Sequence, residues 1–294
     1  MDPARPSTME ASWSAKLVGQ FEDLPWLDKA GDRLQNLIQP LLDHPSAPPI
    51  KNFLGGTWLG HALHPVLSDL PIGFWAASLV LDLFGASRSA GLLNIAGATA
   101  SVATAATGVN DWTSMHGRER RLALLHGMLN VGALALQVAS IGARLTLKRG
   151  TAVRLSMTGF SLSTAAAYLG GELVYGRGQM VNHDAWTAGP QQWTPVGTEA
   201  SVPEGGIKAV PCEGRKVLLH KAKGEIHAIE DACTHAGGPL SEGEVKDGVV
   251  TCPWHGSRFN LSDGSVCGGP ATYPQLRLQT RVRAGKVEVR GRQG

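Results

Sequence analysis

The sequence is poor in charged residues, in aromatic residues and in cysteine. Charged residues occupy 17% of its 294 positions, against roughly 25% in ordinary soluble proteins. Its four cysteines are too few for a disulfide-dense secreted scaffold. The net charge is only +3 and no basic stripe stands out, so nucleic acid is not an expected partner. The N-terminal residues are polar and lack the apolar core of a secretory signal, so we expect no export by a cleaved leader.

Long apolar segments are abundant instead. Ala90–Val109 and Leu122–Ala143 contain no charged residue and reach the roughly 20 residues that cross a bilayer. Leu70–Leu81 and Leu155–Gly171 are shorter and span only if their polar flanks lie at the headgroups or inside a bundle. The segments are rich in small residues, which let membrane helices pack closely. A water-soluble bundle is the alternative, but soluble helices need a polar face. We expect a four-helix transmembrane bundle.

The residues ahead of these segments predict a helix followed by a linker. Residues 21–43 carry apolar side chains at helical spacing, namely Leu34, Leu37, Ile38 and Leu41. This pattern predicts an amphipathic helix bent at Pro40. Such a helix lies on a membrane surface, packs on a partner helix or packs on its own domain. The next stretch reads HPSAPPIKNFLGG and is expected to be a Pro/Gly linker.

The pattern changes after Trp193 to short strand-like runs separated by turns. The runs are IKAV, KVLLH, EIHAI, GVVTC, LRLQTRV and KVEVR, which indicate a small antiparallel β domain. We therefore expect an α+β protein of two domains. Residues 1–60 form the amphipathic helix and linker, 61–180 the four-helix transmembrane domain, 181–197 a second linker and 198–294 the β domain.

Two Cys/His pairs in this β region carry the chemistry. Cys233-Thr-His235 and Cys252-Pro-Trp-His255 are separated by sixteen residues, so each pair presents a thiolate and an imidazole from one tight loop. Structural zinc sites usually pair Cys with Cys and His with His in sequence. A disulfide is disfavoured in the cytoplasm. The remaining option is an iron–sulfur cluster with two Cys on one iron and two His on the other.

The surrounding residues resemble the Rieske family closely. CTHAGGPL and CPWHGSRFNLSDGSVCGGPA are similar to its two cluster loops, and the likeness covers about the last hundred residues. The resemblance implies a Rieske [2Fe–2S] cluster with Cys233 and Cys252 on the inner iron and His235 and His255 on the outer one. It also implies that Pro270 belongs to the loop that covers the cluster.

Departures from the respiratory type of Rieske protein make the expectation more specific. That type has an extra cysteine in each loop, where this sequence has Gly237 or Gly238 and Trp254. Ser257 is retained as a hydrogen-bond donor to cluster sulfur, but Phe259 replaces a tyrosine that would donate another. A missing donor lowers the potential, so we expect a low-potential, ferredoxin-like cluster. The docking face is expected to surround five residues: His235, His255, Leu240, Trp254 and Pro270.

The helical part has a resemblance of its own. HALHPVLSDLPIGFW, TGVNDWTSMHGRERR, LLHGMLN and GGELVYGRGQMVNH resemble an uncharacterised bacterial four-helix membrane family that is often fused to Rieske domains. His64 and His126 are candidates for axial ligation of a haem b. The alternative, which we favour, is that both histidines hydrogen-bond carboxylates or backbone carbonyls and join helices.

These features predict a membrane-anchored Rieske protein that carries out one-electron transfer. Its partners are membrane lipid and a redox protein, which is a reductase, an oxygenase or a respiratory component. The alternatives are a subunit of a membrane oxidoreductase complex, with haem or quinone in the bundle, and a redox sensor. Thirty-nine residues follow His255 and none is histidine, so the catalytic iron site of a Rieske oxygenase is not expected.

Orientation in the membrane does not follow from charge. Lysines and arginines near the predicted spans divide evenly between the two sides, so the positive-inside rule predicts no orientation. Four spans place both ends of the chain in one compartment. The polar N-terminus favours the cytoplasm, so we expect a multi-pass protein of the inner membrane with the Rieske domain in the cytoplasm.

Overall fold

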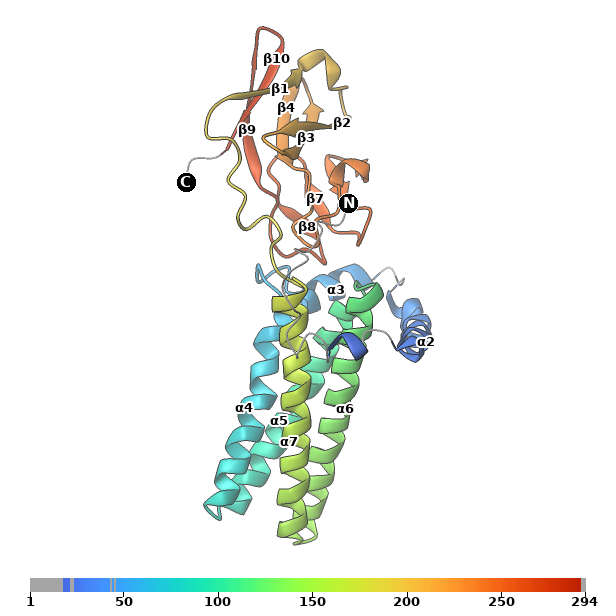
Figure 1. Cartoon of the computed structure of the whole chain (residues 1–294), viewed down its shortest axis with the longest axis vertical. Helices are drawn as coiled ribbons and strands as arrows, with labels where there is room; N and C mark the ends of the chain where they lie inside the picture. Colours follow the sequence, from blue (N-terminus) through green and yellow to red (C-terminus); the bar gives the residue numbers. More distant parts are fainter. Residues whose placement is uncertain (1–17, 22–23, 43, 45, 292–294) are drawn as a thin grey trace. The chain divides into compact units, whose positions relative to one another are not determined.

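The computed structural model describes residues 18–21, 24–42, 44 and 46–291 (Figure 1). The expectation about the N-terminal residues lies outside this part of the chain. Two compact units are present. The first comprises the chain up to Leu42 together with Pro71–Ser101 and Met115–Arg177, and the second comprises Asp43–Leu70, Val102–Ser114 and the chain from Gly178 onward. Some boundaries between the two units therefore fall inside long helices.

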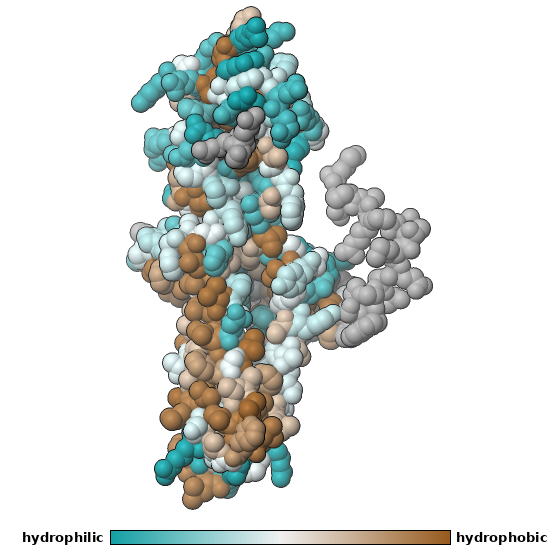
Figure 2. All heavy atoms as spheres, turned by 90° about the vertical axis from the view of Figure 1, so that its left-hand side faces the viewer, coloured by the Kyte–Doolittle hydropathy of each residue, from teal (hydrophilic) through white to brown (hydrophobic). Residues whose placement is uncertain are grey.

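The apolar segments form long helices, as the sequence predicted. They are α4 (Leu63–Leu83), α5 (Ser87–Trp112), α6 (Gly117–Leu145) and α7 (Arg149–Gly171), followed by a π-helical turn, η1 (Glu172–Gly176). In the described part of the chain, three helices are long and apolar enough to cross a membrane: α4, α5 and α6. Figure 2 shows apolar side chains gathered over the helices, whereas the β part is mostly hydrophilic.

The expectation of four spans is therefore too high by one on apolar composition. The helix α7 begins with Arg149 and includes Arg154 and several serines and threonines, which lower its hydropathy. It nevertheless packs along α6, where Gly159 and Gly132 leave room for close approach. A helix that buries polar side chains against a neighbour needs less apolar surface than one that faces lipid on most sides.

The interior of the first unit contains several polar side chains. Asn94, Gln137, Ser140 and Ser156 are fully buried. Gln137 Nε2 donates to the Ser156 carbonyl at 3.1 Å, and Ser156 Oγ donates to Gln137 Oε1 at 3.0 Å, which joins α6 to α7. Asn94 Nδ2 donates to Ser140 Oγ at 3.3 Å, which joins α5 to α6. Hydrogen bonds of this kind hold helices together where lipid provides no hydrophobic driving force between them.

One buried ion pair joins α4 to α6. Arg144 Nη2 lies 2.5 Å from Asp82 Oδ2 and Arg144 Nη1 lies 3.0 Å from Asp82 Oδ1, a bidentate arrangement. The Asp82 side chain is only 1% exposed. Arg149 adds a hydrogen bond to the Asp82 carbonyl at 2.9 Å. This end of the bundle therefore contains a buried carboxylate that is paired with one guanidinium.

Replacing Arg144 by methionine should destabilise the bundle strongly, because the Asp82 carboxylate would remain buried without its partner. Removing one member of a buried pair costs about 3–5 kcal/mol, whereas replacing both by apolar residues is often neutral. We expect Arg144→Met to unfold at much lower denaturant in detergent, and Asp82→Leu/Arg144→Met to recover most of the loss. Equal losses in the single and double variants would contradict this.

The residues ahead of α4 form two further helices. The predicted amphipathic helix is α2 (Pro25–Leu42), which continues past Pro40. The expected Pro/Gly linker is wrong, because α3 (Ala47–Gly55) occupies most of it. Proline at the first helical positions is compatible with a helix start. Gly56 ends α3 with φ 81°, and its N–H donates to the Asn52 and Phe53 carbonyls, a left-handed C-cap that glycine adopts without strain.

The β domain contains two antiparallel sheets. The larger has the order β1-β10-β9-β4-β3-β2 and the smaller β5-β6-β7-β8. The strands are β1 (Thr194–Thr198), β2 (Ile207–Cys212), β3 (Arg215–Ala222), β4 (Glu225–Glu230), β5 (Glu244–Lys246), β6 (Val249–Thr251), β7 (Arg258–Asn260), β8 (Val266–Gly268), β9 (Arg277–Arg283) and β10 (Lys286–Arg290). All six predicted runs are strands, and the sequence pattern missed the short β5, β7 and β8. The strand β1 begins ahead of the expected domain start at residue 198.

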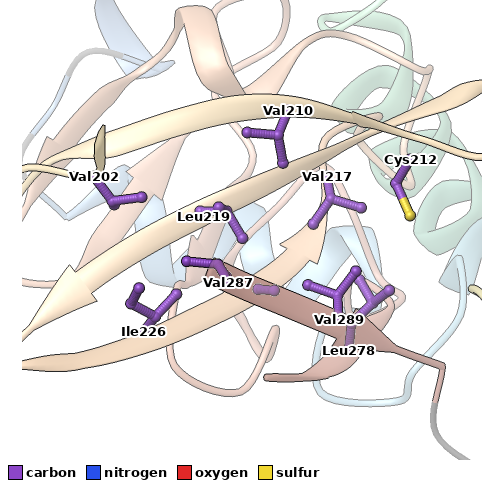
Figure 3. Packing of buried hydrophobic residues seen from close by; sticks show 10 residues of the cluster. Val202, Val210, Cys212, Val217, Leu219, Ile226, Leu278, Val287 and Val289 are labelled. Atoms are coloured by element: carbon purple, nitrogen blue, oxygen red, sulfur yellow. The ribbon is translucent and has the colours of Figure 1, made fainter. Parts of the chain in front are cut away.

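Alternation along β3 and β4 produces two cores. Val217 and Leu219 point into a cluster between the strands of the larger sheet (Figure 3). Leu218 points the other way, into a second cluster that contains Cys233, Cys252 and Phe259. Successive side chains of a strand face opposite sides. The large sheet therefore supports its own core on one face and the cysteine-bearing loops on the other.

Candidate metal centre

Two loops of the β domain carry the four predicted ligands. Cys233 and His235 lie after β4, in ligand loop 1, which leads from the large sheet toward the small one. Cys252 and His255 lie between β6 and β7, in ligand loop 2. Both loops are therefore anchored at each end by hydrogen-bonded structure.

The cysteine of each ligand loop makes the same two backbone hydrogen bonds within its loop, which close the loop. Cys233 N–H donates to the Gly238 carbonyl at 2.8 Å, and Gly237 N–H donates to the Cys233 carbonyl at 2.7 Å. Cys252 makes the equivalent bonds with the carbonyl five residues on, at 2.8 Å, and the amide four residues on, at 3.0 Å. This closure is common to both loops although the histidine follows its cysteine by two residues in one and by three in the other.

The loops bring sulfur to sulfur and nitrogen to nitrogen. Cys233 and Cys252 lie in the same buried cluster, and their thiols interact with each other. The two Nδ1 atoms of His235 and His255 lie 3.2 Å apart, and their rings meet edge to face with centroids 4.9 Å apart. The predicted ligand residues thus converge as one thiol pair and one imidazole pair.

The local electrostatics differ between the two thiols. The contact with Cys252, together with burial, raises the pKa of the Cys233 thiol. The hydrogen bond from Cys233, helped by backbone N–H groups of Trp254 and His255, lowers the pKa of the Cys252 thiol to about 6. Burial, with His255 and His183 nearby, lowers the pKa of His235 to about 4 and keeps its ring neutral. Thiolate and neutral imidazole are the ligating forms of these side chains.

The donor set fits a two-metal cluster. In the part of the chain that the structure describes, no three His, Cys, Asp or Glu side chains are placed to share a single ion. A structural zinc ion needs four donors around one centre. A Rieske cluster instead takes two thiolates on one iron and two imidazoles on the other, which is the pairing that the loops present.

Comparisons with known proteins agree with this chemistry. A family model described as Rieske [2Fe-2S] domain matches residues 192–282. Ferredoxin CarAc of Metapseudomonas resinovorans is 33% identical over 102 residues, which are 34% of this chain and 95% of that ferredoxin. The chain belongs to the Rieske [2Fe–2S] family. A second family model, described as Predicted membrane protein (DUF2231), matches residues 60–185. The protein is therefore a fusion of a membrane domain with a Rieske domain.

Other relatives cover similar parts of the chain. The ferredoxin component of the naphthalene 1,2-dioxygenase system of Pseudomonas aeruginosa is 30% identical over 99 residues, 34% of this chain and 95% of that protein. Apoptosis-inducing factor 3 of Mus musculus is 38% identical over 86 residues, but the chain spans only 14% of its length. The structure of the oxygenase–ferredoxin complex of carbazole 1,9a-dioxygenase aligns with a TM-score of 0.33 and 31% identity, covering 35% of this chain and 97% of the matched chain.

The Rieske loops are flanked by the two side chains that the sequence singled out. Ser257 is fully buried and its Oγ accepts a hydrogen bond from Ala271 N–H at 3.0 Å. The hydroxyl proton of Ser257 is therefore available to donate, and the contact ties the segment after Pro270 to ligand loop 2. Phe259 is fully buried in the cysteine-bearing core and offers no hydroxyl.

Trp254 packs against Gly238, one of the two glycines that the sequence comparison with the respiratory type left open. A Cβ on Gly238 would lie 2.9 Å from the Trp254 ring and 3.1 Å from Cys252 Sγ. Glycine is therefore required for this close approach. The Trp254 indole thus packs directly on the backbone of Gly238, which holds the two Rieske loops together.

The expected docking face needs one correction. Leu240 is completely buried, because it begins the 3₁₀ turn η3 (Leu240–Glu242) and points into the core beneath the loops. The His235 ring is also mostly covered, with 7% of the residue exposed. Trp254 is 55% exposed and His255 and Pro270 are partly exposed. The accessible surface beside the ligands is thus centred on ligand loop 2.

Gln275, a residue that the sequence analysis missed, holds ligand loop 1 in place. Its Nε2 donates to the carbonyls of Glu230 and Ala232 at 3.0 and 2.8 Å, and its Oε1 accepts from Thr234 N–H at 2.8 Å. Gln275 lies forty residues beyond His235, between two strands, and no motif marks it. Only the fold shows that the Gln275 side chain makes the backbone hydrogen bonds that a neighbouring strand would otherwise make with ligand loop 1.

A buried carboxylate pair lies next to the same loop. Arg215 Nη2 lies 3.2 Å from Asp184 Oδ1, and Arg215 Nε lies 3.2 Å from Glu230 Oε1. Burial, together with the charge of Glu230, raises the pKa of Asp184 to about 7 despite the guanidinium. The neighbouring His183 N–H donates to the Thr234 carbonyl at 3.0 Å. The segment before β1 is thus attached to ligand loop 1.

The predicted haem ligands make helix–helix contacts. His64 Nδ1 lies 3.0 Å from the Thr104 carbonyl and 3.2 Å from Thr107 Oγ1. His126 Nδ1 lies 2.7 Å from the Ala166 carbonyl, and its Nε2 lies 3.2 Å from Asn130 Nδ2. These are contacts to backbone carbonyls, as the favoured alternative predicted. The comparisons support the Rieske cluster and give no support to a haem.

The raised pKa of Asp184 predicts an unusual pH dependence of stability. Between about pH 4 and pH 7 the folded chain binds this proton and the unfolded chain does not, so stability falls as the pH rises through this window. Asp184→Asn should flatten the slope by up to about 1.4 kcal/mol per pH unit, the value for one proton. The measurement is denaturant unfolding of the full-length protein in detergent from pH 5 to pH 7.

Asp263 provides the matched control for this prediction. Hydrogen bonds from Ser265 lower the pKa of Asp263. Its contribution to folding stability is therefore fully present above the pKa of an ordinary aspartate. Asp263→Asn should therefore leave the slope between pH 5 and pH 7 unchanged. A wild-type slope in Asp184→Asn would show that Asp184 is not the group responsible.

Proposed function

We propose that this protein is a membrane-anchored Rieske protein that carries single electrons at the cytoplasmic face of the inner membrane. The observation that supports it most is the convergence of a thiol pair and an imidazole pair from two loops with matching closure. The membrane domain keeps the Rieske domain close to membrane partners, which raises their effective concentration. Cys212 and Cys267, the two cysteines outside the ligand set, are not disulfide-bonded, which is compatible with a reducing compartment such as the cytoplasm.

In this proposal each loop contributes one residue to each iron. Cys233 and Cys252 bind the inner iron, and they lie in the apolar core with Phe259 and Leu240. His235 and His255 bind the outer iron. The cluster, when bound, accepts and releases one electron. Ligand loop 2 then offers His255 and the exposed Trp254 ring as the contact surface for a partner.

The partner is proposed to be a soluble or membrane-bound redox protein. Several of the relatives are ferredoxin components of dioxygenase systems, which favours a role in electron transfer to or from another protein. The described Rieske domain consists of sheets and ligand loops, with its accessible ligand in ligand loop 2. We therefore favour electron transfer over catalysis.

Loss of one cysteine ligand should abolish the cluster. We expect Cys252→Ser protein, purified anaerobically in detergent, to lack both iron and acid-labile sulfide and the visible absorption of the wild type. Cys267→Ser is the control, because Cys267 lies in β8 outside the ligand set and should leave the iron content unchanged. Zinc in place of iron and sulfide in the wild type would refute the proposal.

The reduction potential should respond to hydroxyl groups next to the ligands. A hydrogen bond to sulfur stabilises the reduced cluster, and about 1 kcal/mol of preference moves a one-electron potential by roughly 40 mV. We expect Ser257→Ala to lower the potential and Phe259→Tyr to raise it, each by tens of millivolts, in a spectroscopic redox titration. A clearly positive wild-type midpoint would contradict the low-potential assignment.

A further inference from the structure

The polar side of α2 is occupied by α6. Arg120 lies 2.9 Å from Asp32 and 3.5 Å from Asp28, and Arg121 also lies 3.5 Å from Asp28. Arg120 Nη1 donates to Gln35 Oε1 at 2.6 Å. Leu27 and Gly31, on the same side of α2, are buried. Two carboxylates thus neutralise two guanidiniums, and α2 is held on the first turn of α6 (Figure 1).

The apolar residues of α2 lie in a different sector of the helix. At 3.6 residues per turn, the apolar stripe of α2 falls beside the sector that contacts α6, and Lys29 and Asn36 fall in a third sector. We define the stripe by its members, Leu34, Leu37, Ile38 and Leu41. Leu37 and Leu41 are 75% and 72% exposed. Leu34 and Ile38, which lie nearer the docked side, are partly buried. An amphipathic helix that packs on its own protein normally buries its apolar side, whereas α2 docks through Leu27 and its charged residues and leaves Leu37 and Leu41 exposed.

The position of the docking arginines on α6 sets the level of α2 relative to the membrane. The helix α6 has 29 residues, and at 1.5 Å per residue it is about 43 Å long, longer than the roughly 30 Å of bilayer hydrocarbon. Its uncharged segment begins at Leu122, directly after Arg121. Charged side chains at the end of a span belong at the headgroups. The arginines that hold α2 are therefore at the membrane boundary.

We infer that α2 lies in the headgroup–acyl boundary of the bilayer, with its charged side clamped to α6 and its apolar stripe inserted into lipid. The occupant of the stripe is lipid because α6, to which α2 is clamped, itself exposes Val131 and Val138, which face lipid in a membrane-spanning helix. The ion pairs fix α2 on α6 in an orientation that leaves Leu37 and Leu41 exposed. The inference is independent of the redox chemistry of the Rieske domain.

Nitroxide accessibility in the full-length protein tests this arrangement. Single cysteines at Leu37→Cys and Leu41→Cys are labelled in a Cys267→Ser background, since Cys267 is the one native cysteine that is not buried. Asn36→Cys, in the third sector of α2, is the water-facing control. Val131→Cys, at a residue 67% exposed on α6, is the lipid-facing control. Each protein is reconstituted in phosphatidylcholine vesicles and measured with oxygen and with a water-soluble nickel chelate.

The expected result is that the ratio of oxygen to nickel accessibility at both leucine positions follows Val131→Cys and exceeds that at Asn36→Cys several-fold. A ratio like that of Asn36→Cys would place the stripe in water. Low accessibility to both reagents would show that protein covers it. Either result overturns the inference. Unchanged elution of each labelled protein in size-exclusion chromatography controls for folding.

Discussion

The Rieske domain depends on the backbone closure of its two ligand loops. In each loop the cysteine uses both its N–H and its carbonyl within the loop, so its backbone is satisfied without a strand partner. The cysteine is thereby fixed at the base of the loop and the histidine is carried beyond it. Because the two closures match, the thiols meet each other and the imidazoles meet each other. A two-metal donor set follows from this symmetry.

Contacts from the rest of the domain hold the closed loops in place. The second core packs Leu218, Ile229 and Phe259 beneath the cysteines, while Gln275 supplies ligand loop 1 with the hydrogen bonds that a strand would have given it. The indole of Trp254 on Gly238 joins the loops where no disulfide exists. A small domain buries only a small hydrophobic core. Bound metal and these contacts would therefore both help to keep the loops in place.

The helical part differs from the Rieske domain in that polar side chains are buried between its helices and apolar side chains are exposed on them. Its fully buried side chains include Asn94, Gln137 and Ser156, and its exposed ones include large apolar residues such as Val102 and Val131. Hydrogen bonds and the Asp82–Arg144 pair join the helices, which suits a bundle surrounded by lipid. His64 and His126 belong to the same category, since their rings contact the carbonyls of neighbouring helices.

The sequence by itself determined the two-part α+β organisation, the six main strands and the four side chains of the metal centre. Those features follow from local patterns: apolar length, alternation, and Cys/His spacing within single loops. It failed at α3, where prolines at a helix start resembled a linker, at α7, whose polar residues serve packing against α6, and at Leu240, whose neighbours come from other strands. Only the tertiary structure decided the roles of Gln275 and Gly238 and the side of α2 that docks. Each of these depends on which distant segment lies opposite, and a local pattern does not encode that.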